Sequence, residues 1–207
     1  GRRIGKGSSL PGKVALKICP DILRRVKLPE HIVAVTGSNG KTSTVEMVAG
    51  ILQDAGKKVV YNKEGSNQIE GITTLLLCNA TLSGKVKGDV LLLESDERFA
   101  RLTFRQVKPT VLVITNLYRD QLTRNGHPYR IFDYLKMAVD LIPDALLVLC
   151  GDDPIVRKFG LGREKVLYFG MDENSLSSKV SDAVFNDCHY CPNCGKETEV
   201  YSRITGY

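Results

Sequence analysis

Short runs of apolar residues recur along this chain and alternate with longer stretches that have helical spacing. The runs are rich in Val, Ile and Leu and occupy residues 32–35, 58–61, 90–93, 111–114 and 146–149. Because their apolar residues are continuous, both faces of these strands are expected to be buried, as in a parallel sheet. The stretches between them, 42–55, 69–77, 99–107 and 129–141, are predicted helices. The pattern predicts an α/β fold with an open, mostly parallel sheet and helices on both faces.

The carboxyl-terminal part of the chain differs in composition from the alternating strands and helices. A further apolar run at 166–169 is predicted to add an edge strand. From Asp172 the sequence is polar and without apolar periodicity, which indicates a linker into a cysteine-rich tail. No run approaches the roughly 18–20 apolar residues that span a bilayer, and the basic start is followed by no secretion signal. We therefore expect a cytoplasmic protein.

The net charge of +6 is concentrated at the amino terminus. Residues 1–28 hold eight Lys and Arg residues and one acidic residue, which leaves the rest of the chain near neutral. Such a segment is a solvated surface, or it binds anionic lipid headgroups, a pyrophosphate or an acidic partner. Nucleic acid is disfavoured, because the segment has no aromatic residue and the remaining chain has no basic excess.

The strongest local motif joins the first predicted strand to the first predicted helix. Residues 36–44 read Thr-Gly-Ser-Asn-Gly-Lys-Thr-Ser-Thr. In such a turn the backbone N–H groups face phosphate oxygens, the lysine reaches the β- and γ-phosphates, and the threonine hydroxyl binds Mg²⁺. The motif predicts ATP binding by Thr36, Gly37, Ser38, Asn39, Gly40, Lys41, Thr42 and Ser43.

This loop is a shortened variant of the general P-loop. The pattern GxxxxGK would place its first glycine at position 35, where this chain has Val. The alternative interpretation is an ordinary turn in which Thr42, Ser43 or Thr44 caps a helix. The strand before the loop and the helix after it favour the nucleotide site.

A carboxylate follows the predicted strand 90–93. Because carboxyl ends of parallel strands meet at one edge of a sheet, Glu94 is expected beside Thr42, where the two would hold Mg²⁺. We predict Lys41 and Glu94 as the catalytic residues. Asp96 and Glu97 either support this site or are acids that stabilise the first turn of the next helix.

Two further polar residues follow the strand 111–114. Asn116 and Asp120 are predicted to reach the same sheet edge and to contribute to ATP binding.

Three segments together resemble the central ATPase domain of the Mur ligases, namely residues 36–44, 94–97 and 115–121. The resemblance implies activation of a carboxylate as an acyl phosphate that an amine attacks, as in Mur ligases and folylpolyglutamate synthetases. Many Mur ligases have His at the position of Gln121, around a second metal. This departure argues against a conventional two-metal amino-acid ligase.

The resemblance is greatest to one branch of the family, the Mur-ligase-like subunits of lipid II isoglutaminyl synthases. It covers nearly the whole chain and includes residues 5–16, 65–72 and 116–121 and the cysteine-rich tail. It implies ATP- and Mg²⁺-dependent activation of the D-glutamate α-carboxylate of lipid II, followed by amidation to D-isoglutamine in peptidoglycan biosynthesis. The ammonia would come from a GatD-type glutamine amidotransferase subunit. The substrate implies a place at the inner face of the membrane.

The tail resembles the start of a zinc ribbon that is inserted in that branch. Cys191 and Cys194 stand in a C-x-x-C-G turn and would supply half of a Zn²⁺ site, with Cys188 a less favoured ligand. A closed tetrahedral site needs four ligands. The alternative is surface thiols without a metal.

We divide the chain into a basic amino-terminal segment (1–28), a Mur-ligase-type ATP-binding domain (29–180) and a partial zinc ribbon (181–207). The rest of the ribbon and a carboxyl-terminal domain are expected beyond it, so this piece alone is expected to be inactive. Two alternative functions remain. One is an amino-acid-adding ligase of the Mur or folylpolyglutamate type, and the other is a nucleotide-binding scaffold without turnover.

Overall fold

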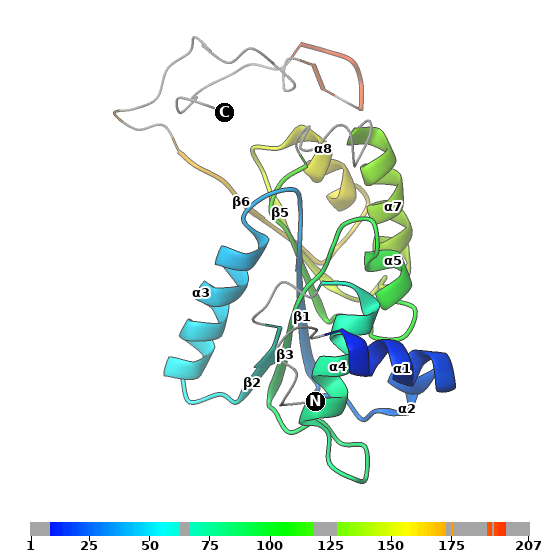
Figure 1. The fold of residues 1–207 in the computed structure, drawn as a ribbon. Helices are drawn as coiled ribbons and strands as arrows, with labels where there is room; N and C mark the ends of the chain where they lie inside the picture. The colour runs from blue at the N-terminus through cyan, green and yellow to red at the C-terminus, as the bar shows by residue number, and fades with distance from the viewer. Residues whose placement is uncertain are drawn as a thin grey trace.

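The computed structural model describes residues 9–62, 67–117, 128–172, 175, 190–191 and 193–197. Within them, six parallel strands form one sheet in the order β2-β3-β1-β4-β5-β6 (Figure 1). The strands are β1 (His31–Thr36), β2 (Val59–Tyr61), β3 (Val90–Glu94), β4 (Val111–Ile114), β5 (Leu146–Cys150) and β6 (Val166–Phe169). The predicted parallel sheet is confirmed, including its edge strand.

Helices cover both faces of this sheet. The longer ones are α1 (Leu10–Ile18), α3 (Lys41–Asp54), α4 (Ile69–Asn79) and α7 (Pro128–Asp140). The shorter ones are α2 (Ile22–Arg25), α5 (Ala100–Thr103), α8 (Pro154–Arg157) and the 3₁₀ turn η1 (Lys158–Gly160). In Figure 1, α3 lies on one side of the sheet and α4, α5 and α7 lie on the other.

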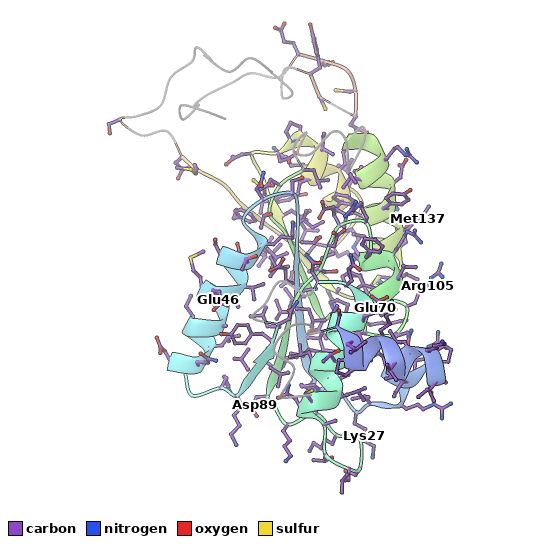
Figure 2. All side chains as sticks on the ribbon, in the orientation of Figure 1. Lys27, Glu46, Glu70, Asp89, Arg105 and Met137 are labelled. Carbon is purple, nitrogen blue, oxygen red and sulfur yellow. The ribbon has the colours of Figure 1, made fainter. Side chains whose placement is uncertain are left out.

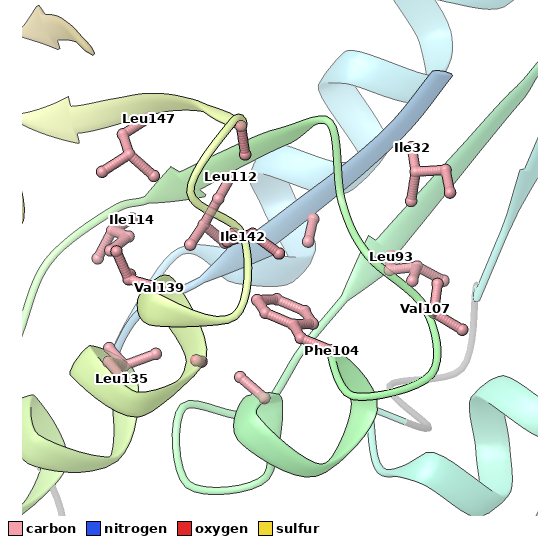
Figure 3. Packing of buried hydrophobic residues seen from close by; sticks show 14 of the residues in the cluster. Ile32, Leu93, Phe104, Val107, Leu112, Ile114, Leu135, Val139, Ile142 and Leu147 are labelled. Carbon is pink, nitrogen blue, oxygen red and sulfur yellow. The ribbon is translucent and has the colours of Figure 1, made fainter. Parts of the chain in front are cut away.

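The buried strands explain why the apolar runs are continuous. Along β3, Leu91 and Leu93 face the larger core, whereas Leu92 faces the smaller core with Val35 and α3. Figure 3 shows the larger core, where Phe104 packs close to the sheet and Leu135 and Val139 approach from α7. Charged and flexible side chains such as Glu46 on α3 and Met137 on α7 lie on the outside (Figure 2).

The predicted helix over 99–107 is the one that differs most from the structure. It is a single turn, α5, continued by turns that end at Val107. Pro109 lies just before β4, and the backbone before a proline disfavours helix. The chain therefore leaves the helix early enough to enter the sheet.

Part of the basic segment is folded onto the domain, which the sequence reasoning did not foresee. Helix α1 packs against α4, and the backbone N–H of Gly12 donates to Thr74 Oγ1 at 2.8 Å. A Cβ at Gly12 would lie 1.9 Å from the carbonyl oxygen of Glu70, so only glycine permits this approach.

Among the described helices, none is long and apolar enough to cross a membrane.

Candidate nucleotide-binding site

The glycine-rich loop connects β1 to α3 at the carboxyl edge of the sheet. Gly37 has φ +136° and Gly40, the residue before α3, has φ +79°, conformations that favour glycine. A Cβ at Gly37 would lie 2.2 Å from Thr115 Oγ1, whereas one at Gly40 would meet no atom within 4 Å. Gly37 is therefore required by contact as well as by conformation.

The residues that follow β4 hold the loop in place. The backbone N–H of Ser38 donates to the carbonyl of Asn116 at 2.9 Å. The Asn116 side chain accepts from the N–H of Asn39 (2.9 Å) and donates to its carbonyl (3.1 Å), and Thr115 Oγ1 donates to the same carbonyl (2.7 Å). Asn116 thus lies at the predicted edge, and its amide fixes the loop.

Lys41 is the first residue of α3, and its side chain folds back over the loop. The ammonium donates to the carbonyl oxygens of Gly37 and Ser38, the second at 3.1 Å. The same nitrogen lies 3.6 Å from Glu97 Oε2. Lys41 is therefore held by backbone and carboxylate oxygens above the turn that would receive phosphates.

Glu94 lies where the sequence predicted it, at the end of β3 and beside the first turn of α3. It is buried, and its Oε2 accepts from the hydroxyl of Thr42 at 2.8 Å. Its Oε1 accepts from Asn67 Nδ2 at 3.3 Å. A carboxylate and a hydroxyl at hydrogen-bond distance are oxygen donors of the type that Mg²⁺ prefers.

Asn62 and Asn67 belong to this site, although the predicted set of site residues contained neither. Asn62 is buried, and its side chain bonds the backbone N–H (2.9 Å) and carbonyl (3.3 Å) of Glu94. A signal was present, since Asn62 is the first polar residue after the strand β2 and so reaches the same sheet edge.

Several buried oxygens beside the loop have no hydrogen-bond partner, namely Thr36 Oγ1, Ser95 Oγ and Glu97 Oε2. Buried polar atoms are rarely left unsatisfied, and exceptions often mark the position of a ligand or water. The two unsatisfied hydroxyls of Thr36 and Ser95, the glycine turn and the Thr42–Glu94 pair together fit a phosphate group with a divalent cation.

The acids that follow Glu94 have different partners. Asp96 binds the Arg98 guanidinium, with a shortest distance of 3.1 Å, and also accepts from the Arg98 backbone N–H at 2.9 Å. Burial raises the pKa of Glu97 above its usual value of 4.5, and the charge of Lys41 opposes that rise. Glu97 is thus a buried acid at the site and not a solvated residue at a helix start.

Asp153 was missed by the sequence reasoning. It is buried, its Oδ2 accepts from the backbone N–H of Leu117 (2.7 Å), and its Oδ1 caps α8 through Ile155 (2.9 Å) and Val156 (3.1 Å). Burial raises its pKa above 3.8. The residue fixes the segment that follows Asn116.

Two of the remaining predicted site residues, Asp120 and Cys188, lie outside the described residues. Ser43 lies exposed in the first turn of α3. No structural finding tests the assignment of Ser43 and Asp120 to ATP or of Cys188 to zinc.

Cys191 and Cys194 lie in a tight turn. The N–H of Gly195 donates to the Cys191 carbonyl at 2.8 Å, and N–H groups of Cys194 and Asn193 lower the pKa of the Cys191 thiol. Two thiols do not close a tetrahedral site, and the described part of the chain contains no group of three or more metal-binding side chains. The zinc site stays a prediction that needs further ligands.

Comparison with known proteins assigns a family. A family model described as the Mur ligase middle domain matches residues 35–206. The chain is 36% identical over 199 residues to the lipid II isoglutaminyl synthase (glutamine-hydrolyzing) subunit MurT of Streptococcus pneumoniae (strain ATCC BAA-255 / R6). That alignment covers 93% of this chain and 42% of the Streptococcus protein. This chain is 30% identical over 203 residues to MurT of Staphylococcus aureus (strain COL), covering 94% and 44%.

A solved structure agrees with the sequence matches. The pseudomurein peptide ligase type C from Methanothermus fervidus superimposes with a TM-score of 0.62 at 30% identity, covering 86% of this chain and 34% of that ligase. This chain spans less than half the length of the curated relatives it matches.

Proposed function

The chain belongs to the Mur ligase family, and from this premise we propose that it forms the ATP site of a lipid II-amidating enzyme. The reaction would activate the α-carboxylate of D-glutamate in the stem peptide of lipid II and replace its hydroxyl by an amine, giving D-isoglutamine. The observation that carries the nucleotide site is the loop with Lys41 above it and the Thr42–Glu94 pair beside it.

The names of the relatives support the substrate and a partner. Both MurT proteins are named as subunits of a glutamine-hydrolyzing lipid II isoglutaminyl synthase. We infer that this protein also works with a second subunit, a GatD-type amidotransferase that releases ammonia from glutamine.

The proposed site has three parts: one binds phosphate, one binds Mg²⁺ and one is the bound ATP. The N–H groups of the loop and the ammonium of Lys41 bind phosphate oxygens and neutralise charge there. Thr42 and Glu94 would hold Mg²⁺, with Asn67 bonding the Glu94 carboxylate and Asn62 bonding the Glu94 backbone. Bound ATP would supply the phosphoryl group that makes the carboxylate oxygen a good leaving group.

One observation favours a second candidate, a ligase that adds an amino acid. The Methanothermus fervidus structure is named as a peptide ligase. Its sequence identity to this chain, 30%, equals that of the Staphylococcus aureus relative. The two candidates share the ATP site and differ in the amine that attacks.

Mass spectrometry of the product distinguishes them. The full-length protein would be incubated with ATP, Mg²⁺, lipid II and ammonium. Replacement of a hydroxyl by an amine supports amidation, whereas gain of an amino-acid residue, in a reaction supplied with one, supports the second candidate. No product and no ATP consumption would contradict both and favour a nucleotide-binding scaffold. Lys41→Ala should abolish ATP consumption while the protein stays folded.

We also propose that the protein works at the membrane surface. Leu10, Val14 and Ile18 are 62%, 50% and 80% exposed, and one turn separates each from the next on α1. Lys13 and Lys17 are exposed beside them. An apolar stripe flanked by lysines favours an anionic bilayer surface.

Vesicle binding tests this placement. Replacing Leu10, Val14 and Ile18 by Ser should abolish binding to anionic phosphatidylglycerol vesicles. Leu82→Ser is the matched control, because Leu82 is fully exposed but lies outside α1. Wild-type protein that does not bind these vesicles, or a triple variant that binds as well as wild type, would contradict the membrane placement.

A further inference from the structure

Glu97 is a buried carboxylate whose environment at the sheet edge is unfavourable for a charge. It is 5% exposed, and its Oε2 has no hydrogen-bond partner. Burying a carboxylate is destabilising unless hydrogen bonds and a nearby opposite charge offset the lost solvation. Within the described part of the chain, the opposite charge that lies within ion-pair distance is the ammonium of Lys41, 3.6 Å from Oε2.

The other acids of this segment already have their own partners. Glu94 accepts from Thr42 and Asn67, and Asp96 pairs with Arg98. Among the described residues, Glu97 is therefore the carboxylate paired with Lys41. The residues are 56 positions apart in the chain, and the pairing of β1 with β3 brings them together.

The surroundings of Lys41 show what this pairing does. Its ammonium has three hydrogens, and the carbonyls of Gly37 and Ser38 accept two hydrogen bonds from it. Those carbonyls belong to the loop itself, so they fix the nitrogen above the turn. The Glu97 carboxylate approaches from the segment that follows β3 and restrains the same nitrogen from another part of the chain.

We propose that Glu97 is a positioning residue that holds the Lys41 ammonium over the loop before the nucleotide binds. The proposal rests on the proposed nucleotide site and adds a role for a residue outside its phosphate- and metal-binding set. A lysine that is held in place loses less side-chain freedom when it binds the β- and γ-phosphates, which increases affinity.

The proposal makes a prediction with a definite sign. If Glu97 acted only as a negative charge near the phosphates, its removal would reduce repulsion and tighten nucleotide binding. If it positions Lys41, its removal should weaken binding. We expect Glu97→Gln to lower the affinity for AMP-PNP with Mg²⁺ about tenfold, or about 1.4 kcal/mol.

The experiment measures AMP-PNP affinity by titration calorimetry in the full-length protein and three variants. Asp96→Asn is the matched control, because it removes a neighbouring charge that pairs with Arg98 and not with Lys41. It should bind AMP-PNP as well as wild type or more tightly. Glu97→Asp keeps the charge on a shorter side chain and should recover part of the lost affinity.

Thermal unfolding of the same proteins separates positioning from a structural role. Gln has the shape of Glu, and Lys41 keeps the carbonyls of Gly37 and Ser38 as acceptors in the variant, so the melting temperature should not fall in parallel with the affinity. A melting temperature that falls in parallel with the affinity would assign Glu97 a structural role and overturn the proposal.

The other outcomes are equally decisive. Wild-type affinity or tighter binding in Glu97→Gln would overturn the positioning role and leave the proposed function standing. Failure of the wild-type protein to bind AMP-PNP would overturn the nucleotide site, and with it this inference.

Discussion

Replacing Gly37 by Ala tests whether the loop depends on contact or on conformation. The added Cβ would lie 2.2 Å from Thr115 Oγ1 and 2.9 Å from the carbonyl of Asn116. Overpacking of this kind costs about 2 kcal/mol. A non-glycine residue at φ +136° adds about 2 kcal/mol of backbone strain. We expect Gly37→Ala to lower the free energy of unfolding by about 4 kcal/mol.

In a chain of this size each kcal/mol shifts the melting temperature by about 2–4 °C, so Gly37→Ala should melt about 8–16 °C lower. Gly40→Ala is the matched control, because it is in the same loop at φ +79° and its Cβ would meet no atom within 4 Å. It should lose only about 1–2 kcal/mol from backbone strain.

A double-mutant cycle isolates the contact with Thr115. Thr115→Ala alone removes the 2.7 Å hydrogen bond to the Asn39 carbonyl and should cost about 1 kcal/mol. Added to Gly37→Ala, it removes the closest contact and should restore about 1–2 kcal/mol. Equal melting of Gly37→Ala and Gly40→Ala, or strict additivity of Gly37→Ala with Thr115→Ala, would refute the steric argument.

Three further predictions follow from other contacts. Glu94→Gln should weaken Mg²⁺-dependent AMP-PNP binding about tenfold and leave Mg²⁺-free binding unchanged, which calorimetry with and without Mg²⁺ would check. Because burial raises the pKa of Asp153 above 3.8, its contribution to the free energy of unfolding is greatest below pH 3.8 and declines as pH rises through the folded-state pKa. Asp153→Asn should lack this decline, so urea unfolding at pH 4 and pH 7 should show wild type losing stability relative to the variant. Gly12→Ala should lower the free energy of unfolding by about 1–3 kcal/mol, because the added Cβ forces α1 away from α4. Gly50→Ala in α3 is its control, since a Cβ there would meet no atom within 4 Å, and it should raise the free energy of unfolding by up to about 1 kcal/mol. Urea unfolding measures both.

The strands could be predicted because each one carries its signal locally. All six runs became strands within one or two residues of their predicted ends, since burial on both faces requires apolar residues throughout. The helix over 99–107 was the weakest prediction, because its apolar residues are also used by turns that lead into β4. Helix α1 was not predicted, because its buried face is small and its exposed face is apolar.

The sequence by itself determined the glycine loop, the lysine after it and the carboxylate at the end of β3. These follow from local chemistry, because positive φ favours glycine and parallel strands end at a common edge. Only the tertiary structure decided which side chains meet there. The pairing of Glu97 with Lys41, of Asn62 with Glu94 and of Asn116 with Asn39 depends on the strand order, which joins segments far apart in the chain. Burial then decided which two of three neighbouring acids, Glu94 and Glu97, lost their solvent, and a sequence window does not contain that information.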